Sequence, residues 1–169
     1  WSEHAWRPKL TVGLQSLSGD NPDTPRLERF DPLFYEGSPG AWASGSKASM
    51  VFINSNVRAL QARLELQPSP RDIVTVYVAH LRAEYLRSPL QFGQATRVDI
   101  ANGVSAVVAG VTHPHLADDV FVKYTRIVNR HTYLTAGYSA SFPGEAVKRL
   151  LGGRSPVWSG WLVNLVLTY

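Results

Sequence analysis

The sequence contains no cysteine, few charged residues and no long apolar run. Because none of its 169 residues is cysteine, it can form neither a disulfide framework nor a cysteine-based metal site. A transmembrane helix is excluded, since no run of roughly 18 or more apolar residues occurs. Hydrophobic residues make up 44% of the chain and charged residues 18%, a balance that argues against intrinsic disorder.

Sequence motifs of the common enzyme classes are also missing. Neither G-x-S-x-G nor H-E-x-x-H occurs, and no glycine-rich loop leads into a helix. Three residues, namely His131, Ser139 and Ser141, remain candidates for catalytic residues at the rim of an outer-membrane barrel enzyme. We nevertheless expect no catalytic activity and no cofactor. The sequence opens at Trp1 without a leader segment, so we expect either a processed protein or a piece of a longer one.

Residues 157–169 show the pattern on which the rest of the interpretation depends. Apolar and aromatic side chains recur at every second position, namely Trp161, Val163, Leu165, Leu167 and Tyr169. This alternation predicts a strand with one apolar face. It fits a strand of an outer-membrane barrel that ends on an aromatic residue at the membrane interface. It fits the closing strand of a soluble β-sandwich equally well.

Similar alternation recurs along the chain and predicts six long strands. They fall within residues 4–18, 49–67, 72–86, 117–128, 132–142 and 157–169. The only helix expected lies within 144–151 and is stopped by two glycines. A short strand or helix is expected within 103–111. The predicted fold class is therefore all-β.

The connections between these strands alternate in length. Residues 19–47 and 87–116 form long connections and 144–156 a medium one, whereas 68–71 and 129–131 form short turns. Long connections thus gather at one end, as in antiparallel up-and-down transmembrane β-barrels. Six strands are too few to close such a barrel. We therefore expect residues 1–169 to be a single segment, the C-terminal part of a larger barrel.

Two segments near the start of the chain carry a family resemblance. Ser18-Gly19-Asp20 leaves the first strand, and Phe30-Asp31-Pro32 begins the segment FDPLF that follows. Together with SxSFPG at 139–144 they resemble the alginate-export family of Gram-negative outer-membrane proteins. The resemblance implies an even-stranded barrel in the bacterial outer membrane. It also implies export of an anionic polysaccharide, such as alginate, through a basic lumen.

Basic side chains fall on the predicted inner face. With the apolar register facing lipid, the inward positions include Arg7, Lys9, Arg63, Arg82 and Lys123, with Glu65, Glu84 and Asp119 among them. Such cations would guide a polyanion while staying solvated. Alternatively, these charges only pair across neighbouring strands. Arg58 and Arg126 fall on the apolar register, which predicts a bulge or a position near the lipid head groups.

Two loop clusters are candidate metal sites. Asp20, Asn21, Asp23 and Asp31 offer oxygen ligands for calcium, but such clusters more often form turns through side-chain bonds to backbone amides. His113 and His115 flank a proline, and no third ligand is evident in the sequence. We expect no metal site.

The net charge of +4 favours an anionic partner. Our first hypothesis is an outer-membrane channel segment that contacts membrane lipid and passes an anionic polysaccharide or solute, with no nucleic-acid partner. Other components of an export complex are further candidate partners. The alternative is a soluble all-β binding module for an acidic ligand, which would be stable in buffer without detergent.

Overall fold

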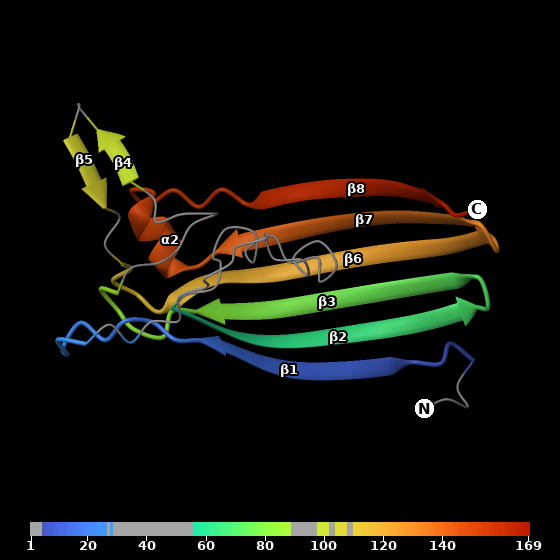
Figure 1. The fold of residues 1–169 in the computed structure, drawn as a ribbon, viewed down its shortest axis with the longest axis horizontal. Coiled ribbons are helices and arrows are strands. Elements are labelled where there is room, and N and C mark those ends of the chain that lie inside the picture. The colour runs from blue at the N-terminus through green and yellow to red at the C-terminus, as the bar shows by residue number, and fades with distance from the viewer. Residues whose placement is uncertain (1–4, 27, 29–55, 89–97, 102–103, 108–109) are drawn as a thin grey trace.

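The computed structural model describes residues 5–26, 28, 56–88, 98–101, 104–107 and 110–169, and one antiparallel sheet dominates it (Figure 1). Its six strands are β1 (Lys9–Leu17), β2 (Val57–Ser69), β3 (Asp72–Arg82), β6 (His115–Asn129), β7 (Thr132–Pro143) and β8 (Trp158–Leu167). They pair in the order β1-β2-β3-β6-β7-β8, and every neighbouring pair is antiparallel. The predicted up-and-down meander of six strands is confirmed.

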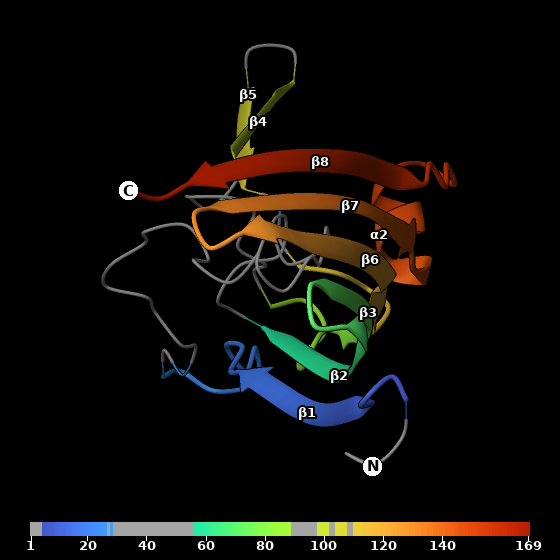
Figure 2. The ribbon, with the colours of Figure 1, turned by 90° about the vertical axis from the view of Figure 1, so that its right-hand side faces the viewer.

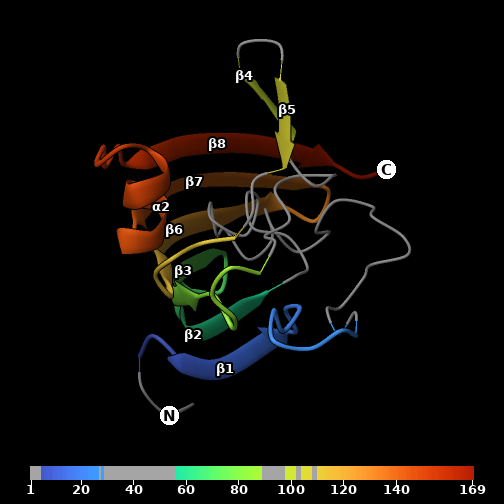
Figure 3. The same ribbon diagram turned by 90° about the vertical axis from the view of Figure 1, so that its left-hand side faces the viewer.

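Two small elements accompany the sheet. A separate hairpin joins β4 (Val98–Ala101) to β5 (Val104–Val107), and α2 (Glu145–Leu150) lies where the helix was expected. Figures 2 and 3 show the main sheet curving from β1 round to β8. Within the described residues β1 and β8 each have one neighbour in the sheet. The sheet is therefore open, as expected of part of a barrel.

The long and short connections lie at opposite ends of the sheet (Figure 1). Tight turns join β2 to β3 and β6 to β7, whereas α2 and the β4-β5 hairpin lie at the other end. The predicted alternation is thus confirmed. Strand β3 ends at Arg82, earlier than predicted, because the backbone amides of Glu84 and Tyr85 donate to the Asn56 side chain and not to a neighbouring strand. The part of the second predicted strand that precedes residue 56 lies outside the described residues.

One face of the sheet is apolar and exposed, and we call it the outer face. Trp161 is 77% exposed, Val12 65% and Tyr138 54%. The register places further exposed apolar side chains beside them, namely Leu10, Leu14, Leu60, Val78, Val120, Val122, Tyr124, Leu134, Val163 and Leu165. An apolar patch that crosses all six strands is far larger than a water-facing sheet carries without a partner. We call this patch the apolar band.

No helix in the described part of the chain has the length and hydropathy needed to span a membrane.

The opposite, inner face carries the buried core. Tyr77, Ala79 and Leu81 of β3 are buried there together with Phe121 of β6, and Ala146 and Val147 of α2 join the same cluster. Toward the short turns the inner face opens, so that Lys9, Arg63 and Asn164 are exposed. The inner face is thus packed near the long connections and polar near the short turns.

Candidate functional site

Three of the predicted lumen residues lie together on the open part of the inner face. Across β1 and β2 Lys9 pairs with Glu65, and across β3 and β6 Thr75 pairs with Lys123. Glu65 and Thr75 are themselves cross-strand partners, so this row lies on one face. Arg63 is two residues from Glu65 and therefore shares that face. We call Lys9, Arg63 and Lys123 the basic row.

The charges of the basic row are only partly neutralised by neighbours. Arg63 Nη2 lies 2.9 Å from Glu65 Oε2, and both side chains are well exposed. An ion pair this exposed contributes about 1 kcal/mol or less, so it leaves the arginine available to other anions. Neither Lys9 nor Lys123 forms a salt bridge with another described residue. The Arg63–Glu65 pair lies within β2, so among the described residues no salt bridge across neighbouring strands accounts for any charge of the basic row.

Strand pairing does not place the remaining two predicted lumen residues in this row. Arg82 pairs with Arg58 across β2 and β3 and shares the outer face with Val78, so its predicted inward position is wrong. The sequence pattern does not distinguish the two sides of β3, because apolar residues occupy both of them. Arg7 lies before β1 in a left-handed conformation with φ 44°, where the pleat of the strand no longer sets the direction of its side chain.

Arg58 and Arg126 bound the apolar band at its two ends. At the short-turn end, Arg126 Nη1 lies 2.7 and 2.8 Å from the two carboxylate oxygens of Asp72. At the long-connection end, Arg58 Nη2 lies 2.6 Å from Glu84 Oε1. The bulge in β6 falls between Ile127 and Asn129, beyond Arg126. A bulge therefore does not explain why Arg126 falls on the apolar register. Its position at the edge of the apolar band does.

The Ser18-Gly19-Asp20 segment ties the end of β1 to the end of β3. The Gly19 amide donates to Glu84 Oε2 at 2.9 Å, and the Asp20 amide donates to Ser88 Oγ at 2.9 Å. A Cβ on Gly19 would lie 2.2 Å from Asn56 Oδ1, so no larger residue fits there. These contacts give the residues of the Ser18-Gly19-Asp20 segment a structural role. Phe30, Asp31 and Pro32 lie outside the described residues.

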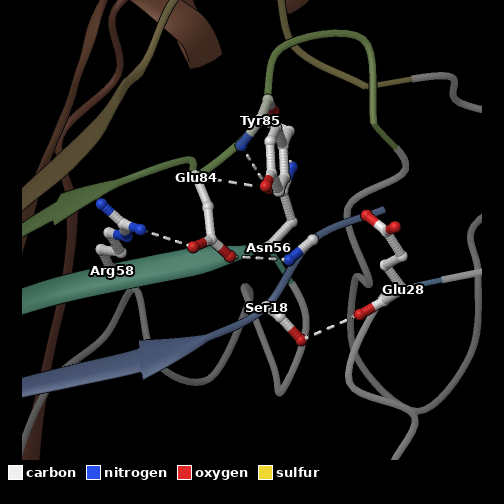
Figure 4. A network of polar contacts seen from close by, with 7 residues as sticks. Ser18, Glu28, Asn56, Arg58, Glu84 and Tyr85 are labelled. Atoms are coloured by element: carbon white, nitrogen blue, oxygen red, sulfur yellow. Dashed lines mark hydrogen bonds and ion pairs between the residues drawn. The ribbon is translucent and has the colours of Figure 1, made fainter. Parts of the chain in front are cut away.

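Asn56 is the centre of this network, and the sequence pattern did not indicate it (Figure 4). Its fully buried side chain accepts from the amides of Glu84 at 3.1 Å and Tyr85 at 2.8 Å, and it donates to the Tyr85 carbonyl at 2.9 Å. Its own amide donates to the Ser18 carbonyl. We call Ser18, Gly19, Asp20, Asn56, Glu84 and Ser88 the polar clamp. It joins three chain segments at the long-connection end.

The acidic loop that follows the polar clamp shows turn chemistry. Asn21 Oδ1 accepts from the Asp23 amide at 3.1 Å, and Asp20 Oδ1 accepts from the Glu28 amide at 2.9 Å. The Asn21 bond spans two residues, as is typical of turns, whereas the Asp20 bond closes a loop of eight residues. The Asn21 bond agrees with the turn interpretation of Asn21 and Asp23.

His115 has partners that were not evident in the sequence. On the outer face Asp118 lies between two histidines, with Oδ1 2.6 Å from His80 Nδ1 and Oδ2 2.8 Å from His115 Nε2. The two imidazole rings stack with their centroids 4.8 Å apart. The three ligand atoms lie close enough together to hold a metal ion. Only the pairing of β3 with β6 brings His80 to this position.

The residues that stayed open for catalysis are not brought together. Ser139 and Ser141 are buried on the inner face of β7, where Ser141 pairs with the buried Asp119. His131 lies in the turn between β6 and β7, at the far end of β7. A nucleophile and a base must lie within hydrogen-bond reach. His131 therefore forms no catalytic pair with either serine.

Comparison with known proteins identifies the family. No curated protein and no solved structure gives a significant match. The family model described as "Alginate export" matches residues 1–156, which is most of the chain and includes every strand except β8. The matched region contains both the basic row and the polar clamp. The chain belongs to the alginate export family.

Proposed function

We propose that this chain is part of an outer-membrane channel through which an anionic polysaccharide such as alginate is exported. Membership of the alginate export family supports the role at the level of the family. The observation that carries the proposal for this chain is the division of the sheet between its two faces. The outer face is apolar and exposed across all six strands, whereas the inner face presents the basic row.

The height of the apolar band fits a bilayer. On β3 the outer positions Val74, Val76 and Val78 lie between Asp72 and His80. At ~3.4 Å per residue this stretch spans roughly 27 Å of strand, or about 20 Å along the membrane normal at the tilt usual in barrels. The apolar belt of outer-membrane barrels is about 25 Å tall. The band is therefore long enough to face acyl chains over most of that height.

The basic row would supply weak, repeated contacts along the lumen. An ammonium or guanidinium group in water attracts a uronate carboxylate without being desolvated. Because Lys9 and Lys123 form no salt bridge with a described residue, each can exchange one carboxylate for the next. Such exchange lets a polyanion move without being trapped.

Planar-bilayer recording on the full-length protein that contains this chain tests the proposal. The triple variant K9Q/R63Q/K123Q should lose most of the anion selectivity, because it removes the row. A control variant, R71Q/R130Q/R154Q, removes the same charge from exposed residues in the connections and should leave selectivity unchanged. Equal selectivity of the two variants would reject the lumen role. A wild-type protein that stays monodisperse without detergent would instead favour the soluble binding module.

A further inference from the structure

A cavity of about 410 Å³ lies at the long-connection end of the outer face. Its lining includes three basic side chains and three leucines, namely Arg58, His80, Arg82, Leu14, Leu60 and Leu86, together with the carboxylate of Glu84. The volume falls in the range of small-molecule sites. Neither the basic row nor the polar clamp needs such a cavity. A cationic wall beside an apolar wall indicates an amphipathic ligand with a negative charge.

The cationic wall contains an arginine that is left without an ionic partner. Arg58 and Arg82 lie directly opposite each other on neighbouring strands, where like charges destabilise the sheet. Arg58 bonds Glu84, whose second oxygen accepts from the Gly19 amide. Arg82 is exposed and forms no ion pair with another described residue. An anion bound between the two guanidinium groups would relieve their repulsion.

The nearby acids leave Arg82 available. Glu84 is committed to Arg58 and to the polar clamp. Asp118 is held by His80 and His115. An arginine guanidinium presents a planar fork of donors that matches a phosphate. The free charge in this cavity is therefore well suited to a phosphate group.

The apolar wall continues into the apolar band. Leu14 is 74% exposed and Leu60 is 57% exposed, and they are cross-strand partners on β1 and β2. Leu60 also lies two residues from Ala62, which pairs with Val78 of the band. A chain of methylene groups that leaves the cavity could thus follow the outer face without crossing polar surface. A free inorganic anion would leave these leucines uncovered.

We propose that this cavity binds the phosphate head group of an anionic lipid. Arg82 makes the main contact, Arg58 and His80 lie beside it, and Leu14 and Leu60 contact the upper part of an acyl chain. The proposal rests on the proposed function, because it places the band in lipid and the cavity at head-group level in the leaflet on the long-connection side. The site would anchor the long-connection end of the sheet at the membrane surface.

Lipid binding by the full-length protein in a neutral detergent tests this site. Phosphatidic acid, whose head group is a bare phosphate, is titrated in, and bound lipid is counted by native mass spectrometry. We expect R82Q to weaken binding by about tenfold, the size of one lost charge-assisted contact. R82K keeps the charge and should retain more binding than R82Q. R130Q, which removes an exposed arginine at the opposite end of the sheet, should bind as the wild type does.

Each result has a clear consequence. Equal binding by R82Q and R130Q would overturn the site. Displacement of the lipid by millimolar inorganic phosphate would assign the cavity to a free anion and overturn the lipid proposal. The same variants are reconstituted in vesicles to separate the two proposals. Wild-type protein that fails to insert counts against the channel, whereas R82Q that conducts normally but has lost the lipid supports the site.

Discussion

Replacing Asn56 by alanine tests whether the polar clamp stabilises the long-connection end of the sheet. The substitution removes an acceptor for the amides of Glu84 and Tyr85 and a donor to the Tyr85 carbonyl. Asn56 is fully buried and its three bonds to these backbone groups are partly buried, so water can replace the lost partner only in part. A buried backbone group left without a partner costs about 1–3 kcal/mol. The lower end of that range, applied to each group, already gives roughly 3 kcal/mol.

The backbone adds to this cost. Asn56 has φ 57°, a left-handed conformation that asparagine tolerates better than alanine, by roughly 1 kcal/mol. We therefore expect N56A to lower the free energy of unfolding by about 4 kcal/mol. N56G loses the same hydrogen bonds, but glycine adopts the left-handed conformation without strain. Its free energy of unfolding should therefore be about 1 kcal/mol higher than that of N56A.

Urea unfolding of the protein folded in micelles, followed by tryptophan fluorescence, measures these differences. N129A is the matched control, because Asn129 is exposed and its side chain accepts a single bond, from the His131 amide at 2.8 Å. We expect N129A to cost less than about 1 kcal/mol, as for an exposed turn bond. If N56A and N129A unfold at the same urea concentration, the clamp is not a stabilising feature and its explanation of the Ser18-Gly19-Asp20 segment fails.

Two further predictions concern a strand glycine and the helix. A Cβ on Gly137 would lie 2.9 Å from Phe121 Cε2, whereas one on Gly13 meets nothing within 4 Å. G137V should therefore lower the free energy of unfolding by about 1–3 kcal/mol, and G13V should be neutral or stabilising; equal effects would refute the contact. In α2 the Arg149 guanidinium, 2.9 Å from the carboxylate, lowers the pKa of Glu145. The pair thus stabilises the fold above the pKa that Glu145 has in the unfolded chain, and this stabilisation is lost as the pH falls through the lower pKa of the folded protein. R149Q should raise the pKa of Glu145 in an NMR titration. An unchanged pKa would contradict the pairing.

Strand alternation was sufficient to predict the sheet and part of the site. Lys9 and Arg63 lie in strands with one apolar and one polar side, so counting in twos placed them on the correct face. Arg82 lies in β3, where Tyr77 and Leu81 face the core and Val76 and Val78 face outward. When both sides of a strand are apolar, the period no longer says which side is which. Only the pairing with β2 settles the face of Arg82.

The contacts that organise the long-connection end could not be predicted from local pattern. Asn56 bonds backbone groups 28 to 29 residues away, and His80 meets an aspartate 38 residues away. A single asparagine or histidine in a strand-rich sequence carries no periodic signal of such contacts. They follow from the register of the sheet, which brings together the ends of β1, β2 and β3 and sets His80 of β3 opposite Asp118 of β6.

The two edges of the sheet bear on how much protein the channel needs. The outer face stays apolar up to both edges, with Val12 65% exposed on β1 and Val163 62% exposed on β8. In lipid each unpaired backbone amide or carbonyl costs several kcal/mol, so an apolar edge strand is stable there only beside another strand. A soluble sheet would instead end in a short, charged or covered edge. The apolar edges, taken with the proposed membrane position, therefore lead us to expect further strands beside β1 and β8, with these six strands forming one arc of a larger barrel.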